Sequence, residues 1–471
     1  MTGSHRRVVV RHRRDRQTRR VRWVIAAVVV LLSMGTVQFS TSARAGPQTS
    51  FHIGPLTRTY YIAADEVAWN YAPSGTNIIT GQQFDATAKK YVQAGPSRIG
   101  SIYRKCLYRG YTDASFTHRL QRPADEDYLG FLGPVIRAQV GDTITVTFRN
   151  NCSFPASIHP HGVFYDKKNE GAPYNDGRPV RDKAGDSVAT RAQYVYTWGV
   201  PERAGPGPMD GSSTMWMYHS HVHEVPDTFS GLMGPIEITA RGKAHPDGRP
   251  NDVDRELFVL YSVMDENSTH YLEAQRRKLA KPPAADDADF QESNKMHSIN
   301  GYVYGNGPLM TMQLGQRVRW YVMSMGNEGD LHTPHWHGNT VIAAGMRTDT
   351  IGLLPGTMVI TDMTPDDPGI WLFHCHVTDH VLAGMQTRYQ VLTTHQAPTT
   401  HQPGPPVLRR NPLSPARTSR TTRASSLSPT RYRPGRLVAQ VADSPPTGGT
   451  QNRPAPLRTA AAGNPLKTVE T

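Results

Sequence analysis

Alternating apolar and polar residues characterise the central part of the chain. In residues 141–150 and 315–324, apolar side chains occupy every second position. In the first of these segments they are Ile144, Val146 and Phe148. This period places apolar side chains on one face of a β-strand. Glycine and proline interrupt the pattern often, and only residues 265–280 allow a short helix. We therefore predict an all-β fold between about residues 50 and 395.

The two halves of this β region repeat each other. In the first half, GDTITVTF at 141–148 precedes HPHG at 159–162. In the second half, GQRVRWYV at 315–322 precedes HWHG at 335–338 at a similar distance. A repeat of this length indicates two homologous β-sandwich domains rather than a solenoid.

The predicted boundary between the repeats is residues 241–254, which are polar and contain glycine and proline. It gives domains at residues 50–245 and 252–395. Residues 396–471 are rich in Pro, Ser, Thr and Arg without periodicity, which predicts a disordered basic tail. Weak contact of this tail with cell-wall or membrane anions is one hypothesis, and a passive solvated tail is the simpler one.

Residues 1–45 are typical of an export signal. An arginine-rich start precedes an apolar run and a small-x-small pattern that ends at Ala45. Arg19 and Arg20 form a pair before the apolar run, which resembles a twin-arginine signal. An uncleaved membrane anchor is the alternative. We expect an exported protein, either extracellular or in the cell envelope.

The basic character of the chain belongs to its two ends. Residues 1–45 and 401–471 each carry a net charge of +9, so the formal charge of +13 leaves −5 for the segment between them. A mildly acidic folded part does not indicate nucleic-acid binding, and no nucleic-acid partner is predicted.

Four histidine clusters contain the candidate chemistry. In each cluster two histidines lie two positions apart, so both side chains of a pair face the same side of a strand. The pairs are His159 and His161, His219 and His221, His335 and His337, and His374 and His376. Eight convergent imidazoles are too many for one zinc ion, which takes four ligands. They suit three metal ions that share eight histidines and leave room for a small ligand.

Cys375 lies between two of these histidines and therefore points to the opposite face of its strand. Two histidines, one cysteine and a weak axial methionine form the blue-copper electron-transfer site. The residues that can complete such a site here are His332, His380 and Met385. Soft sulfur ligands and imidazole favour copper, and the strand would connect the two kinds of site by a few covalent bonds.

Taken together, the four clusters resemble the copper motifs of multicopper oxidases. DYLGFLGPVIRAQVGD at 127–142, INGYVYGN at 299–306 and PGIWLFHCHVTDHVLAGM at 368–385 are similar to the ceruloplasmin-like branch. The two-domain length resembles the bacterial small laccases. The resemblance implies two cupredoxin-like Greek-key β-sandwich domains and about four copper ions per chain. It also implies that oxidation of a small reducing substrate is coupled to reduction of O₂ to water.

The resemblance assigns each ligand to a type of copper. The type 1 copper would take His332, Cys375, His380 and Met385. The type 2 copper would take His159 and His335. The type 3 pair would take His161, His219, His221, His337, His374 and His376. Two further residues match family positions near the trinuclear cluster: Tyr165 as a donor of an electron or proton, and Asp349 as a proton relay.

The first domain lacks three type 1 ligands. Ser220 stands where the second domain has Cys375, and Ala156 and Val225 stand where it has its two histidines. We therefore expect a type 1 copper in the second domain only. Each domain would supply half of the trinuclear ligands, so that cluster must lie at a domain interface, within one chain or between chains. Resemblance to small laccases implies a homotrimer with the site between chains.

Two other functions fit parts of this pattern. A copper nitrite reductase also has two such domains, but it needs a type 1 site in the first domain. A ceruloplasmin-like module that only binds copper is expected to lose cluster ligands, and this chain has them all. The copper stoichiometry distinguishes these three functions.

The sequence does not determine the reducing substrate, or whether Cys106 and Cys152 form a disulfide. Phenols, aromatic amines, bilirubin and Fe(II) are substrates of such sites, and Fe(II) requires carboxylates beside the type 1 histidines. Asp330 and Asp379 are the acidic neighbours in sequence. Cys106 and Cys152 form either a disulfide, in an oxidising compartment, or two buried thiols.

Overall fold

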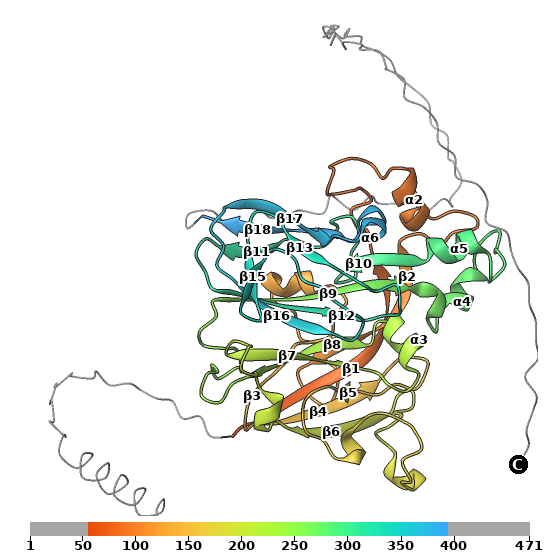
Figure 1. Cartoon of the computed structure of the whole chain (residues 1–471). Coiled ribbons are helices and arrows are strands. Elements are labelled where there is room, and N and C mark those ends of the chain that lie inside the picture. Colours follow the sequence, from red (N-terminus) through yellow and green to blue (C-terminus); the bar gives the residue numbers. More distant parts are fainter. Residues whose placement is uncertain (1–54, 394–471) are drawn as a thin grey trace, which may run out of the picture. The chain divides into compact units, whose positions relative to one another are not determined.

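The computed structural model describes residues 55–393 (Figure 1). The predicted export signal and the predicted tail lie outside the described residues. Strands predominate in this part of the chain and the helices are short, which confirms the all-β prediction. None of the helices within residues 55–393 has the length and apolar character needed to span a membrane.

The first half of the described chain forms two four-stranded sheets with the orders β2-β1-β4-β6 and β3-β8-β7-β5. Their strands are β1 (Thr57–Asn70), β2 (Ile102–Tyr111), β3 (Ile136–Gln139), β4 (Thr143–Asn150), β5 (His159–Pro160), β6 (Gln193–Gly199), β7 (Ser213–His219) and β8 (Met233–Thr239). The pairs β1–β4 and β3–β8 are parallel, and the other pairs are antiparallel. Neighbours that are not consecutive in the chain are typical of Greek-key connections.

The second half repeats this topology in sheets with the orders β10-β9-β12-β16-β14-β15 and β11-β18-β17-β13. The strands are β9 (Arg255–Asp265), β10 (Lys295–Ile299), β11 (Met310–Gln313), β12 (Val318–Ser324), β13 (Pro334–Trp336), β14 (Val341–Ala343), β15 (Met346–Thr348), β16 (Met358–Met363), β17 (Gly369–Cys375) and β18 (Gln386–Leu392). Here β9–β12 and β11–β18 are the parallel pairs. The repeat inferred from sequence is therefore present in the strand order.

Short helices lie between the strands. The α-helices are α2 (Ala86–Val92), α3 (Glu224–Phe229), α4 (Leu272–Arg276), α5 (Ala288–Ser293) and α6 (Thr378–Leu382). The 3₁₀ helices are η1 (Ala124–Leu129), η2 (Lys167–Asn169), η3 (Val180–Asp182), η4 (Glu202–Ala204) and η5 (Glu266–Ser268). The helix expected within 265–280 is present as η5 and α4. Asp287 caps α5 by accepting a hydrogen bond from Phe290 N at 2.8 Å.

Apolar side chains from both halves contribute to the larger core. That cluster includes Leu107 and Phe131 from the first half together with Leu260 and Trp320 from the second. In Figure 1 the sheet containing β12 and β16 lies next to the sheet containing β7 and β8. A smaller core lies within the first half. The shared core fixes how the two halves face each other.

A disulfide joins Cys106 on β2 to Cys152, which follows β4, with their Cα atoms 6.1 Å apart. This observation decides between the two alternatives that the sequence left open. The disulfide connects β2, the outer strand of the first sheet, to the loop after β4. Disulfides of this kind persist in oxidising compartments.

Candidate metal centre

A compact buried site surrounds Cys375 at the end of β17. The Cys375 Sγ lies 3.9 Å from His332 Nδ1 and 3.6 Å from His380 Nδ1, and the two Nδ1 atoms lie 3.1 Å apart. His332 precedes β13, and His380 is on α6. Three segments far apart in sequence thus bring one sulfur and two nitrogens within ligand distance of a common point.

The backbone holds Met385 beside this site. Met385 N donates to His380 O at 2.9 Å, and Cys375 N donates to Met385 O at 3.1 Å. The side chain of Met385 is fully buried. The structure therefore places the fourth predicted ligand next to two of the others in the hydrogen-bonded framework.

Polar neighbours orient the ligands of this site. His332 Nε2 lies 3.1 Å from Asp330 Oδ1, which leaves His332 Nδ1 toward the sulfur. The Asp330 carboxylate is buried and also accepts from Val263 N at 2.6 Å. Thr333 N donates to Cys375 Sγ at 3.4 Å. Burial raises the pKa of the Cys375 thiol, and the backbone hydrogen bond opposes that shift.

The second half also gathers four histidines on the other face of β17. His335 on β13 is the register partner of His374 on β17. His374 Nε2 lies 3.2 Å from His335 Nδ1 and 3.0 Å from His337 Nε2. The His376 ring centroid is 5.3 Å from that of His335. Because His374 and Cys375 are consecutive, their side chains point to opposite faces of one strand, as the alternation predicted.

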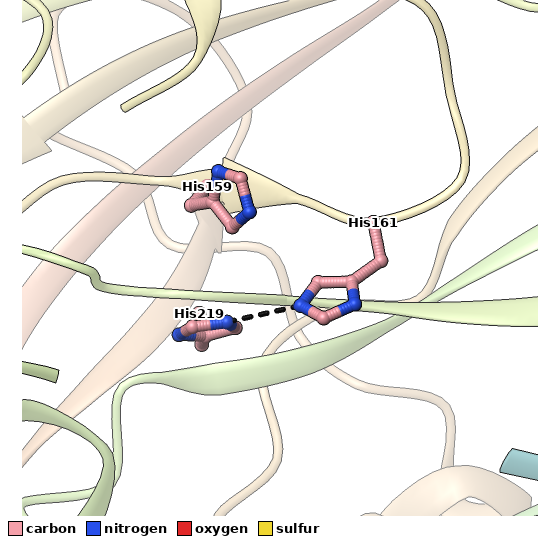
Figure 2. Close-up of side chains that lie close together, drawn as sticks. All are labelled: His159, His161 and His219. Atoms are coloured by element: carbon pink, nitrogen blue, oxygen red, sulfur yellow. Dashed lines mark hydrogen bonds between the residues drawn. The ribbon is translucent and has the colours of Figure 1, made fainter. Parts of the chain in front are cut away.

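The first half gathers the other four histidines in the same register. His159 on β5 pairs with His219 at the end of β7. His161 Nε2 lies 3.1 Å from His219 Nε2, and Figure 2 shows these rings and His159 facing a common point. The ring centroid of His159 is 5.5 Å from that of His219 and 5.2 Å from that of His221.

Backbone carbonyls fix the orientation of several of these imidazoles. The Nδ1 atoms of His159, His219 and His374 lie 2.7, 3.0 and 2.7 Å from the carbonyl oxygens of Glu170, Ser220 and Cys375. An Nδ1–H that donates to a carbonyl leaves the Nε2 lone pair for a metal ion. Burial, followed by the neighbouring histidines, lowers the pKa of His219 to about 3 and of His161 to about 4. Both are therefore neutral near pH 7, which is the form that binds metal ions.

The two four-histidine sets do not meet within one chain. Among residues 55–393, the ring contacts of these eight histidines join only members of the same half. Each set also forms its own three-histidine group of ligand atoms within 4.8 Å. Each half of the chain thus offers an incomplete but preformed ligand set.

A hydroxyl–carboxylate network occupies the first-half position that matches the Cys375 site. Ser220 Oγ donates to Asp227 Oδ2 at 2.6 Å, and Ser157 N donates to Ser220 Oγ at 3.0 Å. His270 Nε2 lies 2.7 Å from Asp227 Oδ1. These side chains satisfy one another and offer no sulfur ligand.

Comparison with known proteins identifies the family. Two family models, each described as multicopper oxidase, match residues 129–243 and 277–395. The chain belongs to the multicopper oxidase family. This membership confirms the expected cupredoxin-like fold, and the family's metal is copper.

Three curated proteins of Homo sapiens are similar to about three quarters of this chain. Ferroxidase HEPHL1 is 44% identical over 345 residues, covering 72% of this chain and 30% of that protein. Ceruloplasmin is 44% identical over 349 residues, covering 72% and 33%, and hephaestin is 42% identical over 349 residues, covering 73% and 30%. The chain therefore spans about a third of the length of these relatives. A solved structure described as a multicopper oxidase is 18% identical over 72% of this chain and 89% of that one, with a TM-score of 0.44.

The donors present in this multicopper oxidase fit copper. A buried cysteine with two imidazoles and a neighbouring methionine is a soft ligand set, which suits copper rather than magnesium or calcium. In the histidine sets, the Nε2 atoms of His161 and His219 converge, and His374 Nε2 lies near His337 Nε2 and His335 Nδ1. Both observations come from residues that the fold has already oriented, so little reorganisation is needed to bind the metal.

The two additional residues predicted from the family resemblance lie beside the histidine sets. The Tyr165 ring centroid is 5.8 Å from that of His159, and burial raises the pKa of Tyr165. Asp349 Oδ2 lies 3.6 Å from His335 Nε2, and the Asp349 side chain is more than half exposed. Both side chains therefore lie next to the histidine sets.

A cluster near His380 was missed by sequence reasoning. The His297 ring centroid lies 5.3 Å from that of His380, and His297 is buried with Nδ1 3.1 Å from Lys295 O. Glu292 lies near enough to His297 to influence its pKa, which burial lowers to about 4. A lone histidine on β10 and a glutamate on α5 carry no local sequence signal. Only the packing of the α5–β10 segment against α6 shows the cluster.

Proposed function

We propose that this chain is a copper oxidase that takes electrons singly from a reducing substrate and uses them to reduce O₂ to water. The observation that supports it best is the two-faced strand β17. Cys375 Sγ faces His332 and His380, whereas the adjacent His374 faces His335 and His337. An electron that enters at the cysteine site has a short covalent path to the histidine set.

Copper, when bound, would supply the one-electron transfers and the site at which O₂ is reduced. His332, Cys375, His380 and Met385 would hold a type 1 copper. His159 and His335 would hold a type 2 copper. His161, His219, His221, His337, His374 and His376 would hold a type 3 pair. The first half would hold no type 1 copper, because Ser220 is engaged with Asp227.

The protein's own groups would position the ligands and move protons. Asp330 would hold the Nε2–H of His332, so that the His332 Nδ1 lone pair remains available. Asp349, exposed beside His335, would exchange protons between solvent and the histidine set. Tyr165, beside His159, would donate an electron or a proton.

Replacing the thiolate tests this proposal directly. Cys375→Ser should abolish the visible thiolate-to-copper absorption and lower oxidase turnover by about a hundredfold or more, because an oxygen cannot replace the soft ligand. The matched control is Ser220→Ala in the first half, which should remain blue. Copper analysis of the wild type should give about four copper ions per chain. A colourless wild type that is fully loaded with copper would refute the type 1 assignment.

We infer that Fe(II) is the best-supported reducing substrate. His380 is largely covered, and beside it lie the imidazole of His297 and the carboxylate of Asp379. The carboxylate of Glu292 lies near His297 in turn. Carboxylate oxygen and imidazole nitrogen are suitable ligands for Fe(II). Oxidation of four Fe(II) ions, with four protons, would reduce one O₂ to two waters. Ferroxidase HEPHL1, 44% identical to this chain, is named for this activity.

Neighbouring side chains keep this acidic cluster in place. Tyr91 OH donates to Glu292 Oε1 at 2.9 Å, and Lys295 Nζ lies 3.1 Å from Glu292 Oε2. Asp379 directly precedes His380 on α6 and influences the pKa of His380. Asp330, the other acidic neighbour in sequence, is buried against His332 and has a positioning role instead.

Kinetics with two substrates separate the iron site from the copper chemistry. Glu292→Gln should raise KM for Fe(II) about tenfold, because a charged ligand for the cation is lost. Turnover of a phenol should stay within about twofold, since Glu292 is not a copper ligand. Glu273→Gln, at an exposed carboxylate on α4, is the control. Unchanged KM for Fe(II) would contradict the substrate assignment, and loss of both activities would indicate general damage.

We further propose an exported homotrimer. The Cys106–Cys152 disulfide favours an oxidising compartment. Two incomplete histidine sets in one chain favour a site completed by another copy, with the first half of one chain against the second half of the next. The twin-arginine signal and contact of the basic tail with anionic surfaces stay predictions, because both segments lie outside the described residues.

A further inference from the structure

A cavity of about 530 Å³ lies apart from the histidine sets and the Cys375 site. It is partly open to solvent and is lined by the end of β2, the loop that leads into η1, and residues from the second half of the chain. Its apolar and aromatic lining includes Trp69, Leu120, Pro134, Val135, Tyr302 and Pro308. This volume is in the range of pockets that hold ring-sized organic ligands.

Four arginines also line this cavity, and only two of them have partners. Arg122 donates to the carbonyl oxygens of Gly130 and Leu132, at 2.9 and 2.6 Å. Arg137 is paired with buried glutamates. Among residues 55–393, no hydrogen bond or ion pair engages the side chain of Arg109 or Arg119, and Arg109 Nε is buried without a partner.

The charges that act on Arg109 include two other arginines, Arg119 and Arg122, and the carboxylate of Asp65 opposes them. Burial, followed by the charges of Arg119 and Arg122, lowers the pKa of Arg109. The nearby Asp65 carboxylate accepts its hydrogen bonds from Tyr111 and Asn151 instead, both at 2.7 Å.

Two carboxylates line the cavity as well. Glu126 lies 3.1 Å from Arg249 Nη2 and 3.8 Å from Arg137 Nη2, so its ion pairs are with arginines other than Arg109 and Arg119. Asp127 is exposed on η1. Guanidinium groups donate to carboxylates in a two-pronged geometry, and an anion in the cavity would satisfy the donors of Arg109 and Arg119.

Two aromatic rings, tilted by 52° to each other, form an apolar wall of the cavity. Trp69 Nε1 donates to Gly301 O at 2.7 Å, which fixes the indole, and the Trp69 and Tyr302 ring centroids are 5.1 Å apart. Arg109 and Arg122 both influence the pKa of Tyr302, so the basic cluster lies beside this wall. An inorganic anion would leave most of the volume and all of the aromatic surface unused.

We propose that this cavity binds a small aromatic carboxylate. Its carboxylate group accepts hydrogen bonds from Arg109 and Arg119, and its ring packs against Trp69 and Tyr302. The site is independent of the copper chemistry, because none of these four residues is a candidate metal ligand.

Calorimetry on the purified full chain tests this proposal with 2-naphthoate as the probe. We expect one binding site per chain, and about tenfold or greater weakening in Arg109→Gln and in Arg119→Gln, because each removes charged donors. The neutral isostere 2-naphthamide should bind about tenfold or more weakly than 2-naphthoate. Arg347→Gln, an exposed arginine on β15, controls for the change in net charge and should bind normally.

Several outcomes would overturn the proposal. Absence of 2-naphthoate binding to the wild type, or equal affinity in both arginine variants, would exclude the site. Inorganic phosphate that binds as tightly as 2-naphthoate and competes with it would show recognition of charge alone and would refute the aromatic ligand. Arg119 is exposed, so Arg119→Gln decides the question even if Arg109→Gln fails to fold.

Discussion

Cys375 is the last residue of β17, and Ser220 directly follows β7 at the matching position of the first half. Their neighbours differ. Thr333 N donates to the sulfur of Cys375, and two imidazoles face it. Ser220 donates instead to the buried carboxylate of Asp227. A single Ser220→Cys change would therefore place a thiol beside a carboxylate rather than beside two histidines. The asymmetry between the halves depends on whole neighbourhoods of residues.

Met385 offers the sharpest test of an individual ligand. A thioether is a weak axial ligand that donates to copper, and its loss favours the reduced ion. Met385→Leu should therefore keep oxidase activity and raise the reduction potential of the blue site. Met346→Leu, at an exposed methionine on β15, should leave the potential unchanged. A redox titration in which Met385→Leu shows an equal or lower potential would mean that Met385 is not axial.

At the scale of elements, strand alternation carried most of the sequence prediction. It placed Cys375 and His374 on opposite faces of one strand, and their contacts lie in two separate sites as expected. The repeated order of motifs also predicted a repeated strand order, which the sheets show. Alternation depends only on the geometry of a single strand, so it can be inferred without tertiary information.

Features that depend on packing between elements could not be inferred in this way. His297 contacts His380 because β10 and α6 come together in the fold. The two histidines are 83 positions apart in the sequence, and no periodic pattern connects them. The basic cavity likewise combines Arg109 of β2, a loop arginine and aromatic residues from both halves. The pairing of His159 with His219 and of His335 with His374 is a matter of register, which the motifs alone do not specify.

At the scale of the whole molecule, the shared core limits where the histidine sets can meet. Leu107 and Phe131 from the first half and Leu260 and Trp320 from the second belong to one buried cluster. Across the same junction, Lys105 Nζ lies 2.5 Å from Glu266 Oε1, and both side chains are fully buried. Breaking such a buried pair is costly, so sliding the halves to bring the histidine sets together within one chain is unfavourable. The proposed association between chains would complete the cluster without breaking this pair.

Mixing two inactive variants tests whether the cluster is shared between chains. His161→Ala with His219→Ala removes ligands from the first half, and His374→Ala with His376→Ala removes them from the second. Each variant alone should be inactive. In randomly mixed assemblies, a site between chains receives an intact first half with a probability of one half. It receives an intact second half with the same probability, so about a quarter of the sites should recover. If the cluster lay within one chain, every chain would carry a damaged half and mixing would restore nothing. Verified mixed assemblies without oxidase activity would therefore exclude the interchain site.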